Sequence, residues 1–249
     1  MALDKVSFAV TGGSIHALIG PNGAGKTTLF NVISGLLAPT AGSIRLRGRD
    51  ITTLAAHARV ALGLGRTFQN LRLFGEMSVL ENVMTGMHPR LEAPWPSAVL
   101  RLPNARSEER SAIRRGHDLA HMIGLEDRID RPAASLAYGD QRRLEIARAL
   151  ASEPALLLLD EPAAGMNPTE TAALAQMLRS LRDGGLTILL VEHDMNFVMG
   201  LSDQITVLNF GRKIAEGTPA QVRLSPDVVE AYLGGHAAAR LNRQSAGTS

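Results

Sequence analysis

The sequence predicts an α/β fold with a parallel β-sheet, and three features carry that prediction. Residues 155–160 and 186–191 are aliphatic at all but one position each and have the length of strands that are buried on both faces. Between them, apolar residues recur at helical spacing over 174–181 and stop before two glycines. A third aliphatic segment, 15–19, runs into a glycine-rich turn. Two buried strands joined by an amphipathic helix form a βαβ unit, which places the strands in parallel in one sheet.

Length, composition and charge narrow the class of protein. The 249 residues are enough for one large domain or for a core with a subdomain. The sequence contains no cysteine, which excludes disulfides, a thiol nucleophile and cysteine-ligated metals. The longest unbroken aliphatic run, 155–159, is far shorter than the about 18 residues that cross a bilayer. The net charge of +2 lacks the excess of basic residues typical of nucleic-acid-binding proteins, so we expect no nucleic-acid partner.

The first elements follow from alternation and from turn residues. Val6, Phe8 and Val10 alternate with Lys5, Ser7 and Ala9, which predicts a strand over residues 3–10 with Phe8 in the core. After a Thr-Gly-Gly turn we expect a strand over 15–19, a helix over 27–37 and a hairpin over 43–51.

The remaining predicted elements indicate how the chain is organised into subdomains. Ser78 and Glu81 form a capping box that opens a helical insert. After the βαβ unit we expect a hairpin over 205–215, a short helix over 226–233 and an aperiodic tail. The predicted organisation is a core of residues 1–70 and 145–215 that includes an antiparallel β subdomain, a helical subdomain over 71–144, a C-terminal helical segment over 216–235 and a disordered tail over 236–249.

The glycine-rich turn carries the first chemical motif. Residues 20–27 fit the pattern G-x-x-x-x-G-K-[ST] between a strand and a helix, which is the context that this P-loop motif requires. Backbone N–H groups of the turn converge on phosphate oxygens, and the helix N-terminus adds positive potential. Lys26 is expected to neutralise the β- and γ-phosphates of ATP, and Thr27 to bind Mg²⁺. The residues predicted to bind the nucleotide here are Gly20, Pro21, Asn22, Gly23, Ala24, Gly25, Lys26, Thr27 and Thr28.

Candidate catalytic groups follow two of the buried strands. Asp160 and Glu161 stand where the strand over 155–160 ends, at the edge where α/β sheets bind ligands. We expect Asp160 to support Mg²⁺, and Glu161 to orient and deprotonate the attacking water. His193 follows the next strand and is predicted to donate a hydrogen bond to the γ-phosphate. Gln69, taken alone, reads as an ordinary polar loop residue.

In this order the elements resemble the nucleotide-binding subunits of ABC transporters over nearly the whole chain. Residues 136–150 stand just before the Asp160 strand, where that family keeps its signature motif. The resemblance implies a P-loop NTPase (RecA-like) core that binds and hydrolyses ATP with Mg²⁺. By this resemblance, Gln69 is the residue that links Mg²⁺ to the membrane partner, and residues 164–167 are the D-loop. It also implies that the signature residues Ala137, Tyr138, Gly139 and Asp140 contact ATP.

The resemblance also implies partners. The family works as a head-to-tail pair, homodimeric or heterodimeric, in which each ATP lies between the P-loop of one subunit and the signature of the other. Two integral-membrane permease subunits, and through them a solute-binding protein, complete the importer at the cytoplasmic face of the membrane.

Within the family, residues 66–74, 137–148, 191–195 and 226–234 are similar to the ATPases of branched-chain amino-acid importers. Urea or amide importers have similar subunits and stay an alternative. A soluble ABC ATPase that acts on DNA or ribosomes is a rival, although it would normally carry a long coiled-coil insert, tandem cassettes or a basic face. A P-loop kinase or GTPase would leave residues 136–150 and His193 without a role.

Two departures from the family pattern matter. The usual signature is Leu-Ser-Gly-Gly-Gln, whereas this chain has Ala137, Tyr138 and Asp140 at three of those places. A serine hydroxyl is therefore missing, and the Asp140 carboxylate is expected to add negative charge near an anion. Second, the chain begins after the strand and the adenine-stacking aromatic residue that family members usually carry. We expect either a truncated start or weak adenine stacking.

Overall fold

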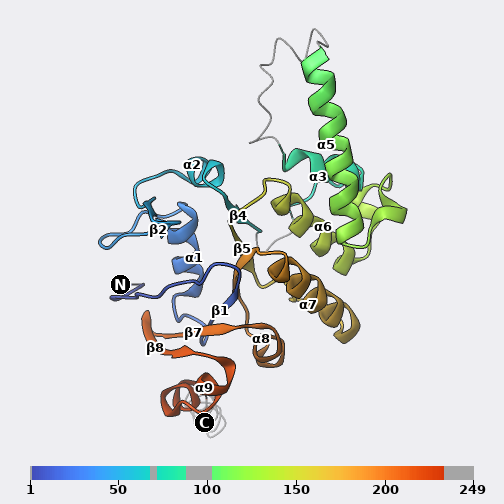
Figure 1. Ribbon diagram of the computed structural model, residues 1–249. Coiled ribbons are helices and arrows are strands. Elements are labelled where there is room, and N and C mark those ends of the chain that lie inside the picture. Colours follow the sequence, from blue (N-terminus) through green and yellow to red (C-terminus); the bar gives the residue numbers. More distant parts are fainter. Residues whose placement is uncertain (1, 68–71, 88–102, 233–249) are drawn as a thin grey trace, which may run out of the picture. The chain divides into compact units, whose positions relative to one another are not determined.

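The computed structural model describes residues 2–67, 72–87 and 103–232 (Figure 1). The chain divides into two compact units. Unit 1 comprises residues 1–52 and 182–249, and unit 2 comprises residues 53–181. The domain bounds expected from the sequence stay a prediction, and the expected tail over 236–249 lies outside the described residues.

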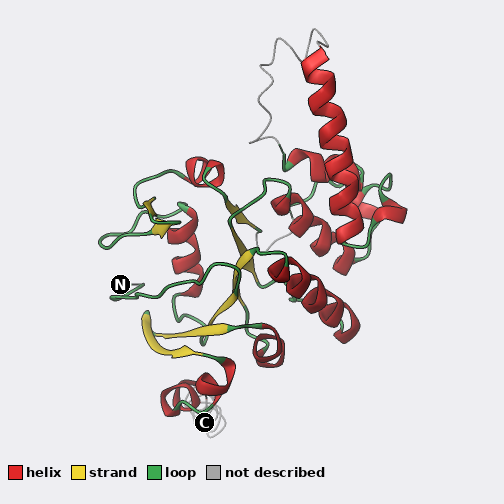
Figure 2. Cartoon of the chain, in the orientation of Figure 1, coloured by secondary structure: helices red, strands yellow, loops and turns green. Residues whose placement is uncertain are grey.

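The sheet of unit 1 has its most buried strand in the middle. Strand β1 (Ile15–Ile19) is buried at all five residues and pairs in parallel with β6 (Thr187–Val191) on one side and with β7 (Gln204–Asn209) on the other. Strand β8 (Arg212–Gly217) then pairs with β7 in the antiparallel sense, as Figure 2 shows. The predicted parallel α/β sheet and its closing hairpin are therefore confirmed.

The strand predicted over residues 3–10 is absent from the structure. The segment is extended, and its side chains alternate between exposed and half-buried as the pattern requires, but it joins no sheet ladder. The reason is that β1, the strand that follows, already has partners along both of its edges. Phe8 packs half-buried against the ring of His16, at 5.5 Å between ring centroids. His16 itself is a core residue that hydrogen-bonds to Thr206, and burial lowers its pKa.

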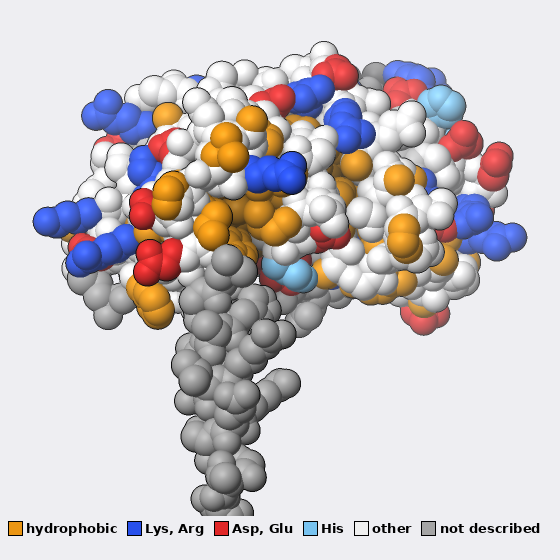
Figure 3. Space-filling view, turned by 90° about the horizontal axis from the view of Figure 1, so that it is seen from below, with side chains coloured by type: hydrophobic (Ala, Val, Ile, Leu, Met, Phe, Trp, Pro, Cys, Tyr) orange, Lys and Arg blue, Asp and Glu red, His pale blue; other side chains and the backbone are white. Residues whose placement is uncertain are grey.

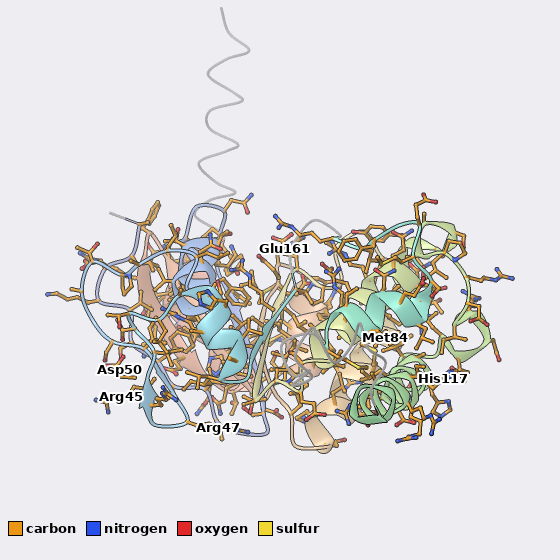
Figure 4. All side chains as sticks on the ribbon, turned by 90° about the horizontal axis from the view of Figure 1, so that it is seen from above. Arg45, Arg47, Asp50, Met84, His117 and Glu161 are labelled. Carbon is orange, nitrogen blue, oxygen red and sulfur yellow. The ribbon has the colours of Figure 1, made fainter. Side chains whose placement is uncertain are left out.

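The other elements of unit 1 lie near their predicted places. Helix α1 (Lys26–Ser34) follows β1 and ends at Gly35, whose φ of 80° lets its N–H return to carbonyls of the last turn. Strands β2 (Arg45–Leu46) and β3 (Arg49–Asp50) form the expected hairpin, with Arg45 opposite Asp50 (Figure 4). The remaining helices are α8 (Met195–Leu201), α9 (Pro219–Arg223) and a helix over 226–232.

Unit 2 combines a short parallel pair with a group of helices. Strand β4 (Leu64–Arg66) pairs in parallel with β5 (Leu156–Asp160). The capping box of Ser78 and Glu81 opens α3 (Val79–Thr85) as predicted. Besides these the unit contains α2 (Ala56–Ala61), α5 (Pro103–Met122), the 3₁₀ turns η2 (Glu126–Arg128) and η3 (Ala133–Ser135), α6 (Tyr138–Leu150) and most of α7 (Pro168–Asp183).

Close helix packing holds the helical part of unit 2 together. Helix α3 lies against both α5 and α6 (Figure 1), and Met84 projects from α3 in Figure 4. Gly116 of α5 has no room for a side chain because Leu80 occupies that place. Over the stretches that the structure describes, no helix has both the length and the apolar character needed to cross a bilayer.

Replacing Gly86 with Ala is expected to lower the free energy of unfolding by about 1–3 kcal/mol, because a methyl group there would overlap the Arg148 carbonyl of α6. The backbone of Gly86 is ordinary helical, so the effect would come from overlap alone. Gly200→Ala is the matched control: Gly200 lies in α8 with no heavy atom within 4 Å of a new Cβ, and it should gain up to about 1 kcal/mol from helix propensity. Thermal unfolding of both variants measures the difference, and equal midpoints would contradict the close approach of α3 to α6.

Candidate active site

The P-loop of unit 1 has the backbone geometry of an anion-binding turn. It connects β1 to α1 through Gly20 and Gly25, whose φ angles are 150° and 101°. A side chain on Gly20 would overlap the Leu208 carbonyl oxygen, so only glycine fits there. No side chain caps the N-terminus of α1, and its first turn contains no acidic residue. The N-terminus of α1 therefore suits an anionic ligand.

Lys26 brings a positive charge to this turn. Its Nζ donates to the carbonyl oxygens of Gly20 at 2.6 Å and Pro21 at 3.0 Å, so the ammonium group folds back over the loop. Asn22, Gly23 and Thr27 are exposed, whereas Ala24 is buried. The loop thus presents a lysine, backbone amides and a threonine hydroxyl on one accessible turn, which suits a polyphosphate with a bound cation.

Two other segments of unit 1 contact the P-loop. The N–H of Gly211, in the β7–β8 turn, donates to the Ala24 carbonyl at 3.0 Å. The backbone of Ala2 lies against the same place: its oxygen would be 2.8 Å from a Cβ on Gly25. Residues near the start of the chain and in the β7–β8 turn therefore pack against the P-loop.

His193 lies at the same sheet edge as the P-loop. Strands β1 and β6 are parallel, with Leu18 opposite Val191, so their carboxyl ends coincide. Gly20 follows one strand end and His193 follows the other by two residues. The His193 side chain is exposed, and the backbone N–H of His193 donates to the buried Glu192 carboxylate at 3.1 Å. The P-loop and His193 therefore lie at one edge of the sheet within unit 1.

The predicted acidic pair stands in unit 2. Asp160 is the last residue of β5 and is 5% exposed, with Arg66 at 3.5 Å from its carboxylate. Its N–H donates to the Thr67 hydroxyl at 3.4 Å. Burial raises the pKa of the Asp160 carboxyl, and the Arg66 guanidinium opposes that rise. A cation bound here would favour the ionised carboxylate in the same way.

Glu161 begins the loop after β5 with a left-handed backbone. Its φ of 49° is unusual for a residue other than glycine and costs about 1–3 kcal/mol. Its side chain is half-buried and is labelled in Figure 4. Such strain is common where a catalytic side chain must be aimed away from the regular alternation of a strand. Gln69 lies outside the described residues.

The signature segment of unit 2 begins α6 with a cluster of charge pairs. The Asp140 carboxylate is buried and pairs with both Arg128 and Arg143, and Arg143 also donates to the Ile123 carbonyl at 2.7 Å. The expected free negative charge near an anion is thus corrected: two guanidinium groups neutralise it. Tyr138 is 42% exposed, and its hydroxyl accepts a hydrogen bond from Arg142 at 3.1 Å.

Replacing Asp140 with Asn is expected to lower the free energy of unfolding by about 1–3 kcal/mol, because two arginines lose a buried partner and a carboxylate leaves the first turn of α6. Asp183→Asn is the control, since that carboxylate is 66% exposed beside Arg182 and should change stability by less than about 1 kcal/mol. Urea unfolding measures both, and equal midpoints would show that the arginines do not depend on Asp140.

Sequence reasoning missed four side chains that shape these sites. The role of Arg66 could not be predicted because β4 has only three residues, which are too few to show a strand pattern. Arg128 and Arg142 are two of many arginines, and nothing in their spacing marks them as partners of Asp140 and Tyr138. Glu170 could have been found, since Asn167 and Glu170 have the spacing of a helix cap and do form one. Among the residues that the structure describes, no three acidic or histidine side chains gather as a metal site.

A family model described as ABC transporter matches residues 3–164, well over half of the chain. The chain belongs to the ABC transporter family. A second model, described as branched-chain amino acid ATP-binding cassette transporter, matches residues 212–238. The resemblance to ABC transporter subunits, the P-loop NTPase fold and the assignment as an ABC-type ATPase are thereby confirmed.

Individual proteins show which members of the ABC family this chain is similar to. It is 47% identical over 235 residues to the high-affinity branched-chain amino acid transport ATP-binding protein LivG of Salmonella typhimurium, covering 94% of this chain and 92% of that one. A crystal structure of an ATP-binding cassette of an ABC transporter in its ADP conformation superimposes with a TM-score of 0.81 at 34% identity, over 94% of this chain and 92% of that one. A dimeric cassette in a post-hydrolysis state with ADP and Pi gives a TM-score of 0.73 at 25% identity, over 88% and 90%.

Proposed function

We propose that this chain is the ATP-hydrolysing subunit of an importer of branched-chain or closely related amino acids. The observation that carries the proposal is that the P-loop turn occurs in a chain 47% identical to LivG over almost its full length. The match of residues 212–238 to the branched-chain family model supports the same cargo class.

In this proposal the nucleotide binds at the P-loop turn of residues 20–28. Lys26 and the amides at the start of α1 hold the β- and γ-phosphates, and Thr27, Asp160 and Gln69 hold Mg²⁺. Bound Mg²⁺ supplies charge neutralisation on the phosphates. Glu161 orients and deprotonates the attacking water, and His193 donates a hydrogen bond to the γ-phosphate.

The signature segment serves a second copy or a related subunit. Residues 137–140 lie at the uncapped N-terminus of α6, so their amides suit the phosphates of an ATP held by a partner's P-loop. The similarity to a dimeric cassette with ADP and Pi supports the formation of a dimer. Whether the pair is a homodimer or a heterodimer depends on the subunits that assemble with this chain.

The membrane partners are two permease subunits, which in turn meet a solute-binding protein outside the membrane. The exposed apolar side chains of Phe74 and Met77, 51% and 38% exposed, lie close in sequence to Gln69 and suit docking to a permease. In this proposal the chain works at the cytoplasmic face of the membrane as a peripheral subunit.

Two alternatives remain for the test to separate. A urea or amide importer would use the same ATPase chemistry with another cargo. A soluble ABC ATPase acting on DNA or ribosomes would need a surface of one charge, whereas Figure 3 shows acidic and basic side chains interspersed on the face that it draws.

The deciding experiment isolates the tagged chain from detergent-solubilised membranes and identifies its partners by mass spectrometry. The expected result is co-purification of two permeases. The complex, rebuilt in vesicles with its binding protein, should then take up labelled leucine with ATP and not labelled urea. Recovery of ribosomes or DNA in place of permeases would refute the proposal, and ATP-driven urea uptake would reassign the cargo.

A further inference from the structure

Within unit 2, the ring of Tyr138 lies against the loop that carries the acidic pair. Gly165 stands four residues after Glu161 in that loop and has a φ of 78°. A Cβ on Gly165 would be 3.1 Å from the ring carbon Cε1 of Tyr138 and 3.6 Å from its hydroxyl. The first residue of α6 is therefore in direct contact with the loop between β5 and α7.

The Tyr138 ring is held in that position from its other side. Arg142 donates to its hydroxyl at 3.1 Å, and the guanidinium lies 5.4 Å from the ring centroid. Arg142 is buried and also pairs with the buried Glu145 at 3.3 Å. Arg142 thus holds the Tyr138 ring while it is itself held by Glu145.

A second contact joins the same two segments. A Cβ on Gly139 would be 2.8 Å from the Glu170 carboxyl group. Glu170 accepts from the Asn167 N–H at 3.0 Å, while Asn167 accepts from the Glu170 N–H at 3.0 Å, and this reciprocal pair opens α7. Tyr138 and Gly139, the first two residues of α6, therefore both pack against residues 165–170.

We propose that Tyr138 is a positioning residue for hydrolysis, which holds the loop of residues 161–167, and with it Glu161, in fixed register with the start of α6 in the same chain. This inference rests on the proposed function, because it requires Glu161 to act on water. It assigns to the Tyr138 side chain a role that the missing serine hydroxyl could not perform.

Turnover and nucleotide affinity together distinguish this role from direct contact with nucleotide. The Tyr138 hydroxyl already accepts from Arg142, and the ring edge faces Gly165. A residue that positions the catalytic carboxylate changes turnover, whereas a residue that binds the ground-state nucleotide changes affinity. Because small misplacements of a catalytic group can cost up to about 100-fold in rate, loss of the ring should be measurable.

The test measures ATP hydrolysis by the whole transporter complex, together with nucleotide affinity of the same preparations. For Tyr138→Ala we expect kcat about 10-fold lower with KM and nucleotide Kd unchanged. Tyr138→Phe keeps the ring and should lose no more than about 2-fold. Met122→Ala, which truncates a side chain 49% exposed at the end of α5, should match the wild type.

Gly165→Ala approaches the same contact from the loop, where a methyl group must displace the ring. It should lower kcat by about 10-fold, and the double variant with Tyr138→Ala should lose far less than the roughly 100-fold of two independent effects. Tyr138 is partly exposed, so its truncation should leave the thermal midpoint nearly unchanged, and Tyr138→Leu provides a second truncation if that midpoint falls.

Three outcomes would overturn the inference: a raised KM at constant kcat, full additivity in the double variant, or wild-type turnover in both truncations. In each of them the wild-type complex still hydrolyses ATP, so the proposed function stands. A wild-type complex that hydrolyses no ATP would instead remove the proposed function and this inference together.

Discussion

Glu161→Gln should lower ATP turnover by about 100- to 10,000-fold, because removal of a general base typically has that effect. The amide keeps the size of the side chain and the left-handed backbone at φ 49°, so the loop after β5 should stay in place. Nucleotide affinity should therefore be unchanged, and bound ATP should persist. Steady-state phosphate release by the assembled complex measures the turnover, and light scattering with ATP present measures the paired state.

Glu153→Gln is the matched control for this change. Glu153 also has a φ of 49°, lies in the same unit and carries an exposed ion pair with Arg115 at 3.1 Å. Its removal should leave turnover within about twofold of the wild type, since exposed pairs contribute little. If Glu161→Gln hydrolysed ATP as fast as this control, another group would have to be the base.

Lys26→Ala should weaken nucleotide binding by about 2–3 kcal/mol, on the order of 30- to 150-fold in Kd. The Lys26 ammonium lies over the carbonyls of Gly20 and Pro21, so it can reach a phosphate without moving the backbone. Its loss removes the one full positive charge that we place on the turn of residues 20–27. Titration calorimetry with ATP measures the effect on the isolated subunit.

Lys213→Ala provides the comparison in the same unit. Lys213 lies on β8 and pairs with Glu216, and it should affect nucleotide affinity by less than twofold. A Kd for Lys26→Ala equal to that of Lys213→Ala, with circular dichroism showing both folded, would contradict a phosphate contact by Lys26.

The features that the sequence predicted best are those in which one residue type has few alternatives. The P-loop requires positive φ at Gly20 and Gly25 and a lysine after them, so pattern and geometry correspond closely. The βαβ unit follows from apolar side chains that can only be buried, and its strands occur where aliphatic runs predict them. Local chemistry determines these features, and local sequence therefore reveals them.

The features that the sequence did not predict depend on partners distant in the chain. Residues 3–10 have a strand pattern but no free edge of β1 to join. The effect of Asp140 depended on Arg128, twelve residues earlier, whose position only the packing of η2 against α6 defines. The contact between Tyr138 and Gly165 likewise joins residues with no shared pattern. Charge balance at a site is thus a property of tertiary packing.

The support of the P-loop by the start of the chain has a practical consequence. The Ala2 backbone oxygen would be 2.8 Å from a Cβ on Gly25, and Gly211 is equally close to this segment. A purification tag or fusion partner attached ahead of Ala2 would emerge beside the nucleotide-binding turn and could alter apparent ATP affinity by itself.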